Sequence, residues 1–313
     1  MMELLTNPVI LFFIFGIFAG LMKSNLEIPS AIAKFLSLYL LMSIGLKGGV
    51  ALAASGLTTS VMTVMSIGVF LAIIVPLISY KLLNKFLNGF DSAAVAATYG
   101  SISAVTFVTA SQYLTTVGIA FGDYMSAVMA LMESPAIIIG VLLANKLRED
   151  SLSIGHIFKD SFIEGANLLL LASLAIGFIA GPVGYAAMAP FSTELFTGIL
   201  ALFLLDMGLQ VAKNIPELKN KNPILILYAT LAPIAHAGLA LCLSVLFSVS
   251  LGNTILLMVL AASASYIAVP AALRFAMPQA SPSVYLGLSL GVTFPFNVIV
   301  GIPLYVWLAT LLS

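Results

Sequence analysis

Two short segments of the chain carry small hydroxyl side chains among apolar neighbours. The first is residues 99–106 (Tyr-Gly-Ser-Ile-Ser-Ala-Val-Thr), and the second is residues 261–270 (Ala-Ala-Ser-Ala-Ser-Tyr-Ile-Ala-Val-Pro). A serine or threonine hydroxyl can donate a hydrogen bond to an anion or turn a lone pair toward a cation such as Na⁺. The chemistry these side chains suit is therefore the binding of a small ion. The candidate substrate-binding residues are Gly100, Ser101, Ser103, Thr106, Ser263, Ser265 and Tyr266.

Both segments also contain a residue that interrupts a helix. Pro270 lacks an N–H donor and clashes with the preceding turn, which frees carbonyl groups around Tyr266. Gly100 permits a departure from helical geometry. Two such breaks facing each other would aim two half-helix N-termini at one point, where free amides and partial positive charge suit a small anion. Close packing of helices is the alternative, because small residues also dominate such contacts; the paired occurrence favours a binding site.

Two further polar residues are candidates for coupling an ion. Glu133 lies deep in an apolar run, where a carboxylate is costly and suggests a function. The alternative is a protonated Glu133 that is hydrogen-bonded to backbone near Pro135. Asn297 could add a side-chain amide to the same place. The candidate ion-coupling residues are Glu133, Ser103, Ser265 and Asn297.

The elements that position these residues must be membrane-spanning helices. Of 313 residues, 61% are apolar and only 8% are charged, whereas a soluble domain carries about 25% charged residues. Zero net charge without a basic tract argues against nucleic-acid binding, and a single cysteine excludes a disulfide framework and a cysteine zinc site. Runs close to the length of a spanning helix predict ten segments, near 8–22, 28–46, 60–80, 92–118, 124–145, 165–182, 195–211, 223–248, 254–274 and 283–312.

The positive charges predict how these segments are oriented. With ten crossings, all but one of the twelve Lys and Arg residues fall on one side of the membrane, and only Lys47 falls in a loop on the other. Positive residues mark the cytoplasmic side. We therefore expect a multi-pass protein of the plasma or inner cell membrane, with both termini outside and the polar connection 146–164 in the cytoplasm.

The two halves of the chain resemble each other at a nearly constant offset. Ser101-Ile102-Ser103 and Ser263-Ala264-Ser265 are 162 residues apart, and similar pairs recur in order along the chain. Each half holds five segments, so the repeats must have opposite orientation in the membrane, which is typical of secondary transporters. We expect a first repeat at 1–150, a cytoplasmic linker at 151–164 and a second repeat at 165–313, with discontinuous helices 4 and 9 crossing.

Four segments resemble a known family. Residues 35–54, the 100–106 break, residues 232–236 (Ala-Pro-Ile-Ala-His) and residues 278–285 look like the SbtA-type sodium-dependent bicarbonate transporters of cyanobacteria. The similarity runs through nearly the whole chain, with a much shorter central cytoplasmic loop. Tyr266 stands where the family has an Asp.

The resemblance implies a fold and a function. It implies a core domain of helices 3–5 and 8–10 that moves in an elevator-like manner against a gate domain of helices 1–2 and 6–7, in a homotrimer. It also implies Na⁺-coupled uptake of a small anion, with bicarbonate the leading substrate, at the two crossed breaks. Na⁺ would be the coupling ion, with no other cofactor. The family has an Asp at the position of Glu133, which implies a role in cation binding.

Other functions fit the sequence less well. The chain lacks a His-Glu-x-x-His metalloprotease motif and shows no nucleophile with a neighbouring base, so we expect no enzyme. A cation/proton antiporter of similar ten-helix fold would need clustered buried carboxylates, and the two breaks contain none. A Na⁺-coupled symporter of a small organic carboxylate stays the nearest alternative, because Tyr266, Ala268 and Val269 make the second break less polar.

Overall fold

The chain folds into helices throughout the part that the structure describes. The computed structural model describes residues 7–147, 165–218 and 222–312, and no β-strand occurs within these ranges. The all-α prediction is confirmed. The predicted linker at 151–164 lies outside the described residues.

The helices follow the apolar segments predicted from the sequence. Within the described ranges, eight stretches are long and apolar enough to cross a bilayer, and α2 and α12 are shorter apolar helices. In chain order the elements are α2 (Pro8–Leu21), α3 (Ser30–Ser55), α4 (Thr59–Leu83), α5 (Gly89–Gly100), α6 (Ala104–Thr116), α7 (Met125–Asn145), α9 (Gly165–Ala186), η1 (Pro190–Glu194), α10 (Phe196–Leu218), α11 (Pro223–Leu246), α12 (Leu251–Ala262), α13 (Ala268–Ala276), α14 (Pro282–Leu288), η2 (Ser289–Thr293), α15 (Phe294–Phe296), η3 (Asn297–Gly301) and α16 (Ile302–Leu312).

Helix α3 is longer than the sequence predicts. The predicted span ends near residue 46 and leaves Lys47 in a loop, but the helix continues to Ser55 and ends at Gly56, whose φ is 65°. Residues 50–55 are mostly alanine and leucine, which are strong helix formers, so the helix has no reason to stop earlier. Lys47 therefore lies on a helix and not in a loop.

Glycines let α2 pack closely against α10. Gly16 of α2 lies against the carbonyl oxygen of Leu205, and Gly208 of α10 lies against that of Phe13. At neither position is there room for a Cβ atom. Small residues of this kind allow two backbones to approach each other within a membrane.

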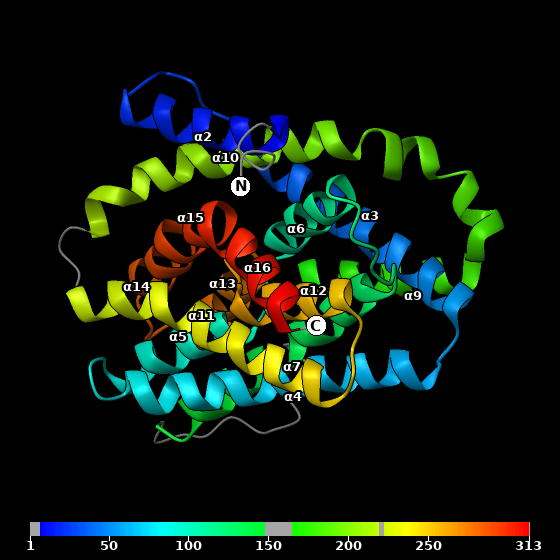
Figure 1. Ribbon diagram of the computed structural model, residues 1–313. Helices are drawn as coiled ribbons and strands as arrows, with labels where there is room; N and C mark the ends of the chain where they lie inside the picture. The colour runs from blue at the N-terminus through cyan, green and yellow to red at the C-terminus, as the bar shows by residue number, and fades with distance from the viewer. Residues whose placement is uncertain (1–6, 148–164, 219–221, 313) are drawn as a thin grey trace.

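A second pair of helices, α3 and α9, packs in the same way. Gly49 of α3 lies against the carbonyl oxygen of Leu174, and Gly177 of α9 lies against that of Leu46. Figure 1 shows α2 and α10 side by side along the top of the molecule, with α3 running from them toward α9.

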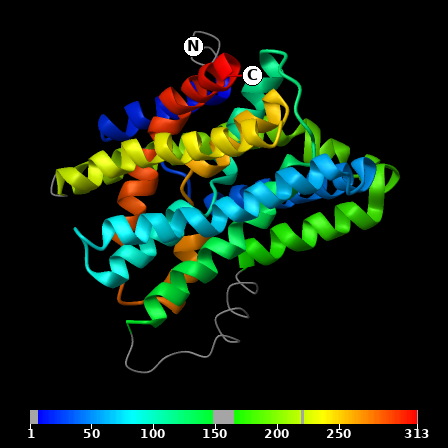
Figure 2. The same ribbon diagram turned by 60° about the horizontal axis from the view of Figure 1, so that its bottom comes forward.

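The remaining helices surround the two broken ones. Helix α4 packs against α5 and α7, and α11 packs against α12. In Figure 1 the helices α6, α12 and α13 lie near the centre of the molecule, and the turned view of Figure 2 brings α4 to the front. The ends of α5, α6, α12 and α13 thus meet inside the protein.

Candidate functional site

Both predicted helix breaks are present. Helix α5 ends at Gly100 and α6 begins at Ala104, with Ser101 (φ −82°, ψ −178°) and Ser103 (φ −107°, ψ 108°) in extended conformation. Helix α12 ends at Ala262 and α13 begins at Ala268. Pro270 lies in the first turn of α13, where a missing N–H costs no helical hydrogen bond.

The two breaks contact each other directly. The backbone N–H of Ser103 donates to Oγ of Ser263 over 2.9 Å, and the backbone N–H of Ser265 donates to the carbonyl oxygen of Thr98 over 2.8 Å. The backbone groups that have no helical hydrogen-bond partner in one break thus find a partner in the other break. Since an unpaired backbone group inside a membrane costs several kcal/mol, this exchange makes two adjacent breaks tolerable.

Equivalent serines lie at the start of the second half of each broken helix. Oγ of Ser103 accepts from the backbone N–H of Thr106 (3.2 Å) and from the Thr106 hydroxyl (2.9 Å). Oγ of Ser265 accepts from the backbone N–H of Val269 over 3.3 Å. Because both oxygens act as acceptors in these hydrogen bonds, each serine keeps a hydroxyl hydrogen that can be donated to another group.

A small cavity lies where the two breaks meet. Its volume is about 10 Å³, which is room for a single water molecule or an ion of that size. It is lined by Leu41, Ile102, Ser103, Ala104, Glu133, Ser265, Tyr266, Ile267 and Ala268. Four residues predicted from the sequence therefore come together here: Ser103, Ser265, Tyr266 and Glu133.

Tyr266 and Glu133 are the large polar residues of this cavity. Both are buried, with 8% and 3% of their surface exposed. The Tyr266 ring packs against Phe294 with centroids 5.1 Å apart. Its hydroxyl lies near that of Ser103, but it forms no hydrogen bond of standard geometry within the described part of the chain. A buried hydroxyl without a partner costs about 1–3 kcal/mol, and a ligand in the cavity would satisfy it. Glu133 adds a carboxylate to the same wall.

The other predicted residues surround the cavity without lining it. Gly100 packs against the Pro76 ring, which leaves no room for a Cβ atom. It is therefore needed for close approach, whereas the sequence suggested a need for flexibility. Ser101 is buried beside it. Thr106 and Ser263 are hydrogen-bonded to Ser103.

Asn297 supports the second break from outside the cavity. Its Nδ2 donates to the carbonyl oxygen of Ala262, the last residue of α12, over 2.8 Å. Its Oδ1 accepts from the Tyr305 hydroxyl, also over 2.8 Å. The side chain thus satisfies a carbonyl group that the break frees, and the sequence placed it in the site itself.

The apolar wall of the cavity was not predicted. Leu41 belongs to α3, and Ile102, Ala104, Ile267 and Ala268 come from the breaks themselves. Ordinary apolar residues in an apolar helix carry no signal that separates a cavity wall from a lipid-facing surface. Only the packing of α3 against the breaks identifies Leu41.

A known protein family matches the chain. No curated protein matches the chain. The family described as the Na⁺-dependent bicarbonate transporter superfamily matches residues 8–310, and this confirms the resemblance seen in the sequence. A transporter family also agrees with the predictions of a multi-pass membrane protein and of no enzyme. The match covers nearly the whole chain, which therefore belongs to the Na⁺-dependent bicarbonate transporter superfamily.

Proposed function

We propose that this protein is a Na⁺-coupled symporter of bicarbonate, which binds both ions where the two broken helices meet. The observation that carries the proposal is the cavity shared by Ser103, Ser265, Tyr266 and Glu133. It combines hydroxyl donors, two helix N-termini and one carboxylate among buried residues. Few other groupings suit an anion and a cation at once.

The anion is bound by the hydroxyls and the helix ends. Ser103 and Ser265 can each donate a hydrogen bond while accepting one from their own helix, and the Tyr266 hydroxyl is a third donor. The N-termini of α6 and α13 add partial positive charge. Together they offer donors from two sides, as a planar carboxylate-like anion requires.

The cation is bound with the help of Glu133. The two breaks contain no carboxylate, and Glu133 is the acidic residue that lines the cavity. Uptake of one anion against an inside-negative potential costs about 2.3 kcal/mol per 100 mV, and one Na⁺ moving with it cancels that cost. The Na⁺ gradient then supplies the driving force.

The helices belong to ten crossings in two inverted repeats. Glycine packing supports this arrangement, since Gly16 and Gly177 are 161 residues apart and Gly45 and Gly208 are 163 apart. Gly16 and Gly208 lie in the contact of α2 with α10, and Gly45 and Gly177 lie in the contact of α3 with α9. If the two repeats are exchanged, the contact of α2 with α10 becomes the contact of α9 with α3. The repeats are 1–150 and 165–313, joined by the linker 151–164.

Transport proceeds by an elevator-like movement. The cavity of about 10 Å³ is too small for bicarbonate, so the anion binds only when the breaks and α3 separate. The moving core comprises α4–α7 and α11–α16, and the gate comprises α2, α3, α9 and α10. Leu41 is the residue through which α3 closes the cavity.

The remaining elements of the proposal concern assembly and orientation. The outer face of α9 exposes Ile179 and Val183 by 84% and 88%, and such a face fits against lipid or a second copy in a homotrimer. The distribution of positive charge supports termini outside a plasma or inner cell membrane.

Two alternatives are less well supported. A cation/proton antiporter needs a group of acidic residues, and no three His, Cys, Asp or Glu side chains gather within the described ranges. A symporter of a small organic carboxylate is less well supported, because the family that matches the chain is described by bicarbonate.

Uptake into proteoliposomes tests the proposal. Labelled bicarbonate should enter vesicles faster when a Na⁺ gradient points inward than with K⁺ on both sides, and a carboxylate such as acetate should not compete well. Anion uptake that ignores the Na⁺ gradient would contradict coupling. Proton flux without any dependence on the anion would favour an antiporter.

A further inference from the structure

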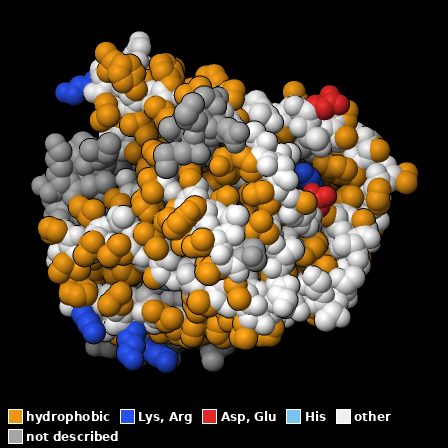
Figure 3. Space-filling model, in the orientation of Figure 1, with side chains coloured by type: hydrophobic (Ala, Val, Ile, Leu, Met, Phe, Trp, Pro, Cys, Tyr) orange, Lys and Arg blue, Asp and Glu red, His pale blue; other side chains and the backbone are white. Residues whose placement is uncertain are grey.

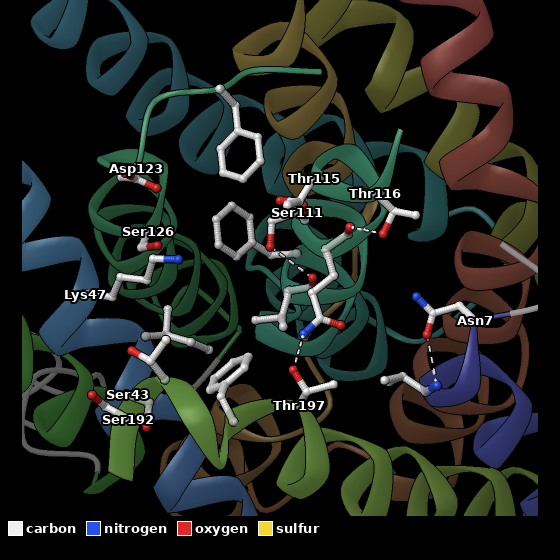
Figure 4. A pocket seen from close by; sticks show the side chains of 18 of the residues that line it. Asn7, Ser43, Lys47, Ser111, Thr115, Thr116, Asp123, Ser126, Ser192 and Thr197 are labelled. Carbon is white, nitrogen blue, oxygen red and sulfur yellow. Dashed lines mark hydrogen bonds between the residues drawn. The ribbon is translucent and has the colours of Figure 1, made fainter. Parts of the chain in front are cut away.

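A second, much larger cavity opens beside the site. It has a volume of about 480 Å³ and lies between α3, α6 and the start of α10, with the N-terminal end of α2 at its edge. Figure 4 shows its labelled polar side chains, and Figure 3 shows a hollow on the right of the molecule that holds a blue and a red side chain. We call this cavity the vestibule. Its polar residues are Asn7, Ser43, Lys47, Ser111, Gln112, Thr115, Thr116, Asp123, Ser126, Ser192, Thr193 and Thr197.

Lys47 is the cation that lines the vestibule. Figure 4 shows its side chain extending from α3 beside Ser126, with the nitrogen directed into the cavity. Lys47 is exposed and forms no ion pair with the residues that the structure describes. Asp123 also lines the vestibule and opposes this charge. The lysine that the sequence placed in a loop therefore faces a polar cavity.

The hydroxyls of the vestibule are largely engaged with the protein. Ser111 donates to the carbonyl oxygen of Val108 (2.9 Å), and Thr115 donates to that of Ser111 (2.9 Å). Gln112 of α6 donates to the Thr197 hydroxyl of α10 over 3.3 Å. With these donors occupied, the ammonium group of Lys47 is the group best able to attract an anion.

A small, mostly apolar cavity, which we call the passage, lies between the vestibule and the site. This third cavity, of about 10 Å³, is lined by Ser37, Leu40, Leu41, Ile44, Ala104, Val105, Val108, Leu200, Phe203 and Ile267. It shares Ile44 and Val108 with the vestibule, and Leu41, Ala104 and Ile267 with the site. The three cavities therefore follow one another between α3 and α6.

We propose that the vestibule is a capture site for small monovalent anions and that Lys47 concentrates them there before they reach Ser103 and Ser265. Because the residues of the passage carry no charge, they do not attract an ion electrostatically. A charged side chain in the vestibule, next to the passage, does. One unit charge a few Å from an anion in water contributes about 1 kcal/mol. That the anion is bicarbonate rests on the proposed function, whereas the attraction of anions by Lys47 does not depend on it.

The first experiment measures attraction without transport. The exposed Cys242 is replaced by Ala, and Ser111→Cys introduces a reporter thiol in the vestibule. Its reaction rates with an anionic and a cationic methanethiosulfonate reagent are then compared. Lys47→Gln should lower the anionic-to-cationic rate ratio by roughly threefold or more, and Lys47→Arg should keep it. Asp123→Asn should raise the ratio.

A matched control lies on the same helix. Lys34 is exposed on α3, about 20 Å along the helix from Lys47, which is beyond the screening length of about 10 Å at 0.1 M salt. Lys34→Gln should leave the rate ratio unchanged. A ratio that Lys47→Gln and Lys34→Gln change equally, or that neither changes, would overturn the inference.

The second experiment measures uptake. Lys47→Gln should raise the KM for bicarbonate roughly threefold with a much smaller change in kcat, and the difference should fade at high ionic strength. If wild-type protein takes up no bicarbonate while the thiol ratio responds to Lys47, the proposed function fails and the capture site stands. If wild-type uptake is normal but neither the thiol rate ratio nor the KM changes in the Lys47→Gln protein, the capture site is wrong and the proposed function is retained.

Discussion

The backbone N–H of Ser103 donates over 2.9 Å to the side chain of Ser263, the counterpart of Ser101 in the second repeat. Oγ of Ser263 in turn donates to the carbonyl oxygen of Leu260 over 2.8 Å. One hydroxyl thus links the start of α6 to the end of α12. The two broken helices are held together by their own irregular backbone, and the cavity lies beside that link.

Removal of this link should loosen the site. Ser263→Ala leaves the Ser103 amide without its acceptor, and a buried unpaired donor costs about 1–3 kcal/mol. We expect a lower melting temperature in detergent and slower Na⁺-driven uptake. Thr63→Ala is the control, because the exposed Thr63 hydroxyl bonds only to Thr59 of its own helix. An equal loss in both variants would contradict a special role for Ser263.

Glu133→Gln should separate cation binding from folding. The amide has nearly the shape of the carboxylate but no charge, so Na⁺ should bind about 10-fold or more weakly, as when a metal site loses a supporting group. The measurement is the Na⁺ concentration that gives half-maximal uptake, together with the Na⁺-induced rise in melting temperature.

Asp206→Asn provides the comparison for Glu133. Asp206 is also buried, but its carboxylate accepts from Gln210 over 2.7 Å and does not line the cavity. Its replacement should leave the Na⁺ requirement unchanged. If the Glu133→Gln protein keeps the wild-type Na⁺ requirement, the coupling ion binds elsewhere.

The helix breaks could be predicted because their residues are unusual in a membrane helix. Closely spaced serines with Gly100 or Pro270 stand out in an apolar run, and the repeat pairs them. What these residues contact could not be predicted. Asn297 supports Ala262 from outside the cavity, and this depends on the π-helical turns η2 and η3, for which sequence has no clear pattern.

The apolar parts of the site were beyond prediction for a different reason. Leu41 closes the cavity and Ile44 joins the passage to the vestibule, yet both look like any residue of a membrane helix. Lys47 was misplaced by a few residues, because hydropathy ends a span at the first charge while the helix itself continues. Side-chain roles that depend on the partner helix appear only in three dimensions.

Tyr266→Phe should affect uptake and stability in opposite ways. The Tyr266 hydroxyl has no hydrogen bond in the described part of the protein, so its removal should leave the melting temperature equal or higher. If that hydroxyl binds the anion, the KM for bicarbonate should rise roughly 10-fold, as expected for one hydrogen bond to a charged group.

The control for Tyr266 is a second buried tyrosine. The Tyr228 hydroxyl also has no hydrogen bond within the described residues, but Tyr228 does not line the cavity. Tyr228→Phe should therefore leave the KM unchanged. A normal KM in the Tyr266→Phe protein would show that the anion does not contact this hydroxyl.

Alanine at Gly208 should disturb the packing of α2 against α10. A Cβ atom there would collide with the carbonyl oxygen of Phe13, and backbone cannot yield as a flexible side chain does, so we expect a loss of about 1–3 kcal/mol. Gly198→Ala in the same helix meets open space and should be neutral or slightly stabilising. Gly45 is the repeat counterpart of Gly208, and a Cβ atom there would collide with the carbonyl oxygen of Leu170. If the two repeats pack alike, Gly45→Ala in the contact of α3 with α9 should therefore lower the melting temperature about as much as Gly208→Ala. A large fall in melting temperature at one position and none at the other would mean that the two helix contacts are not equivalent. The inverted repeat would then lose its main structural support.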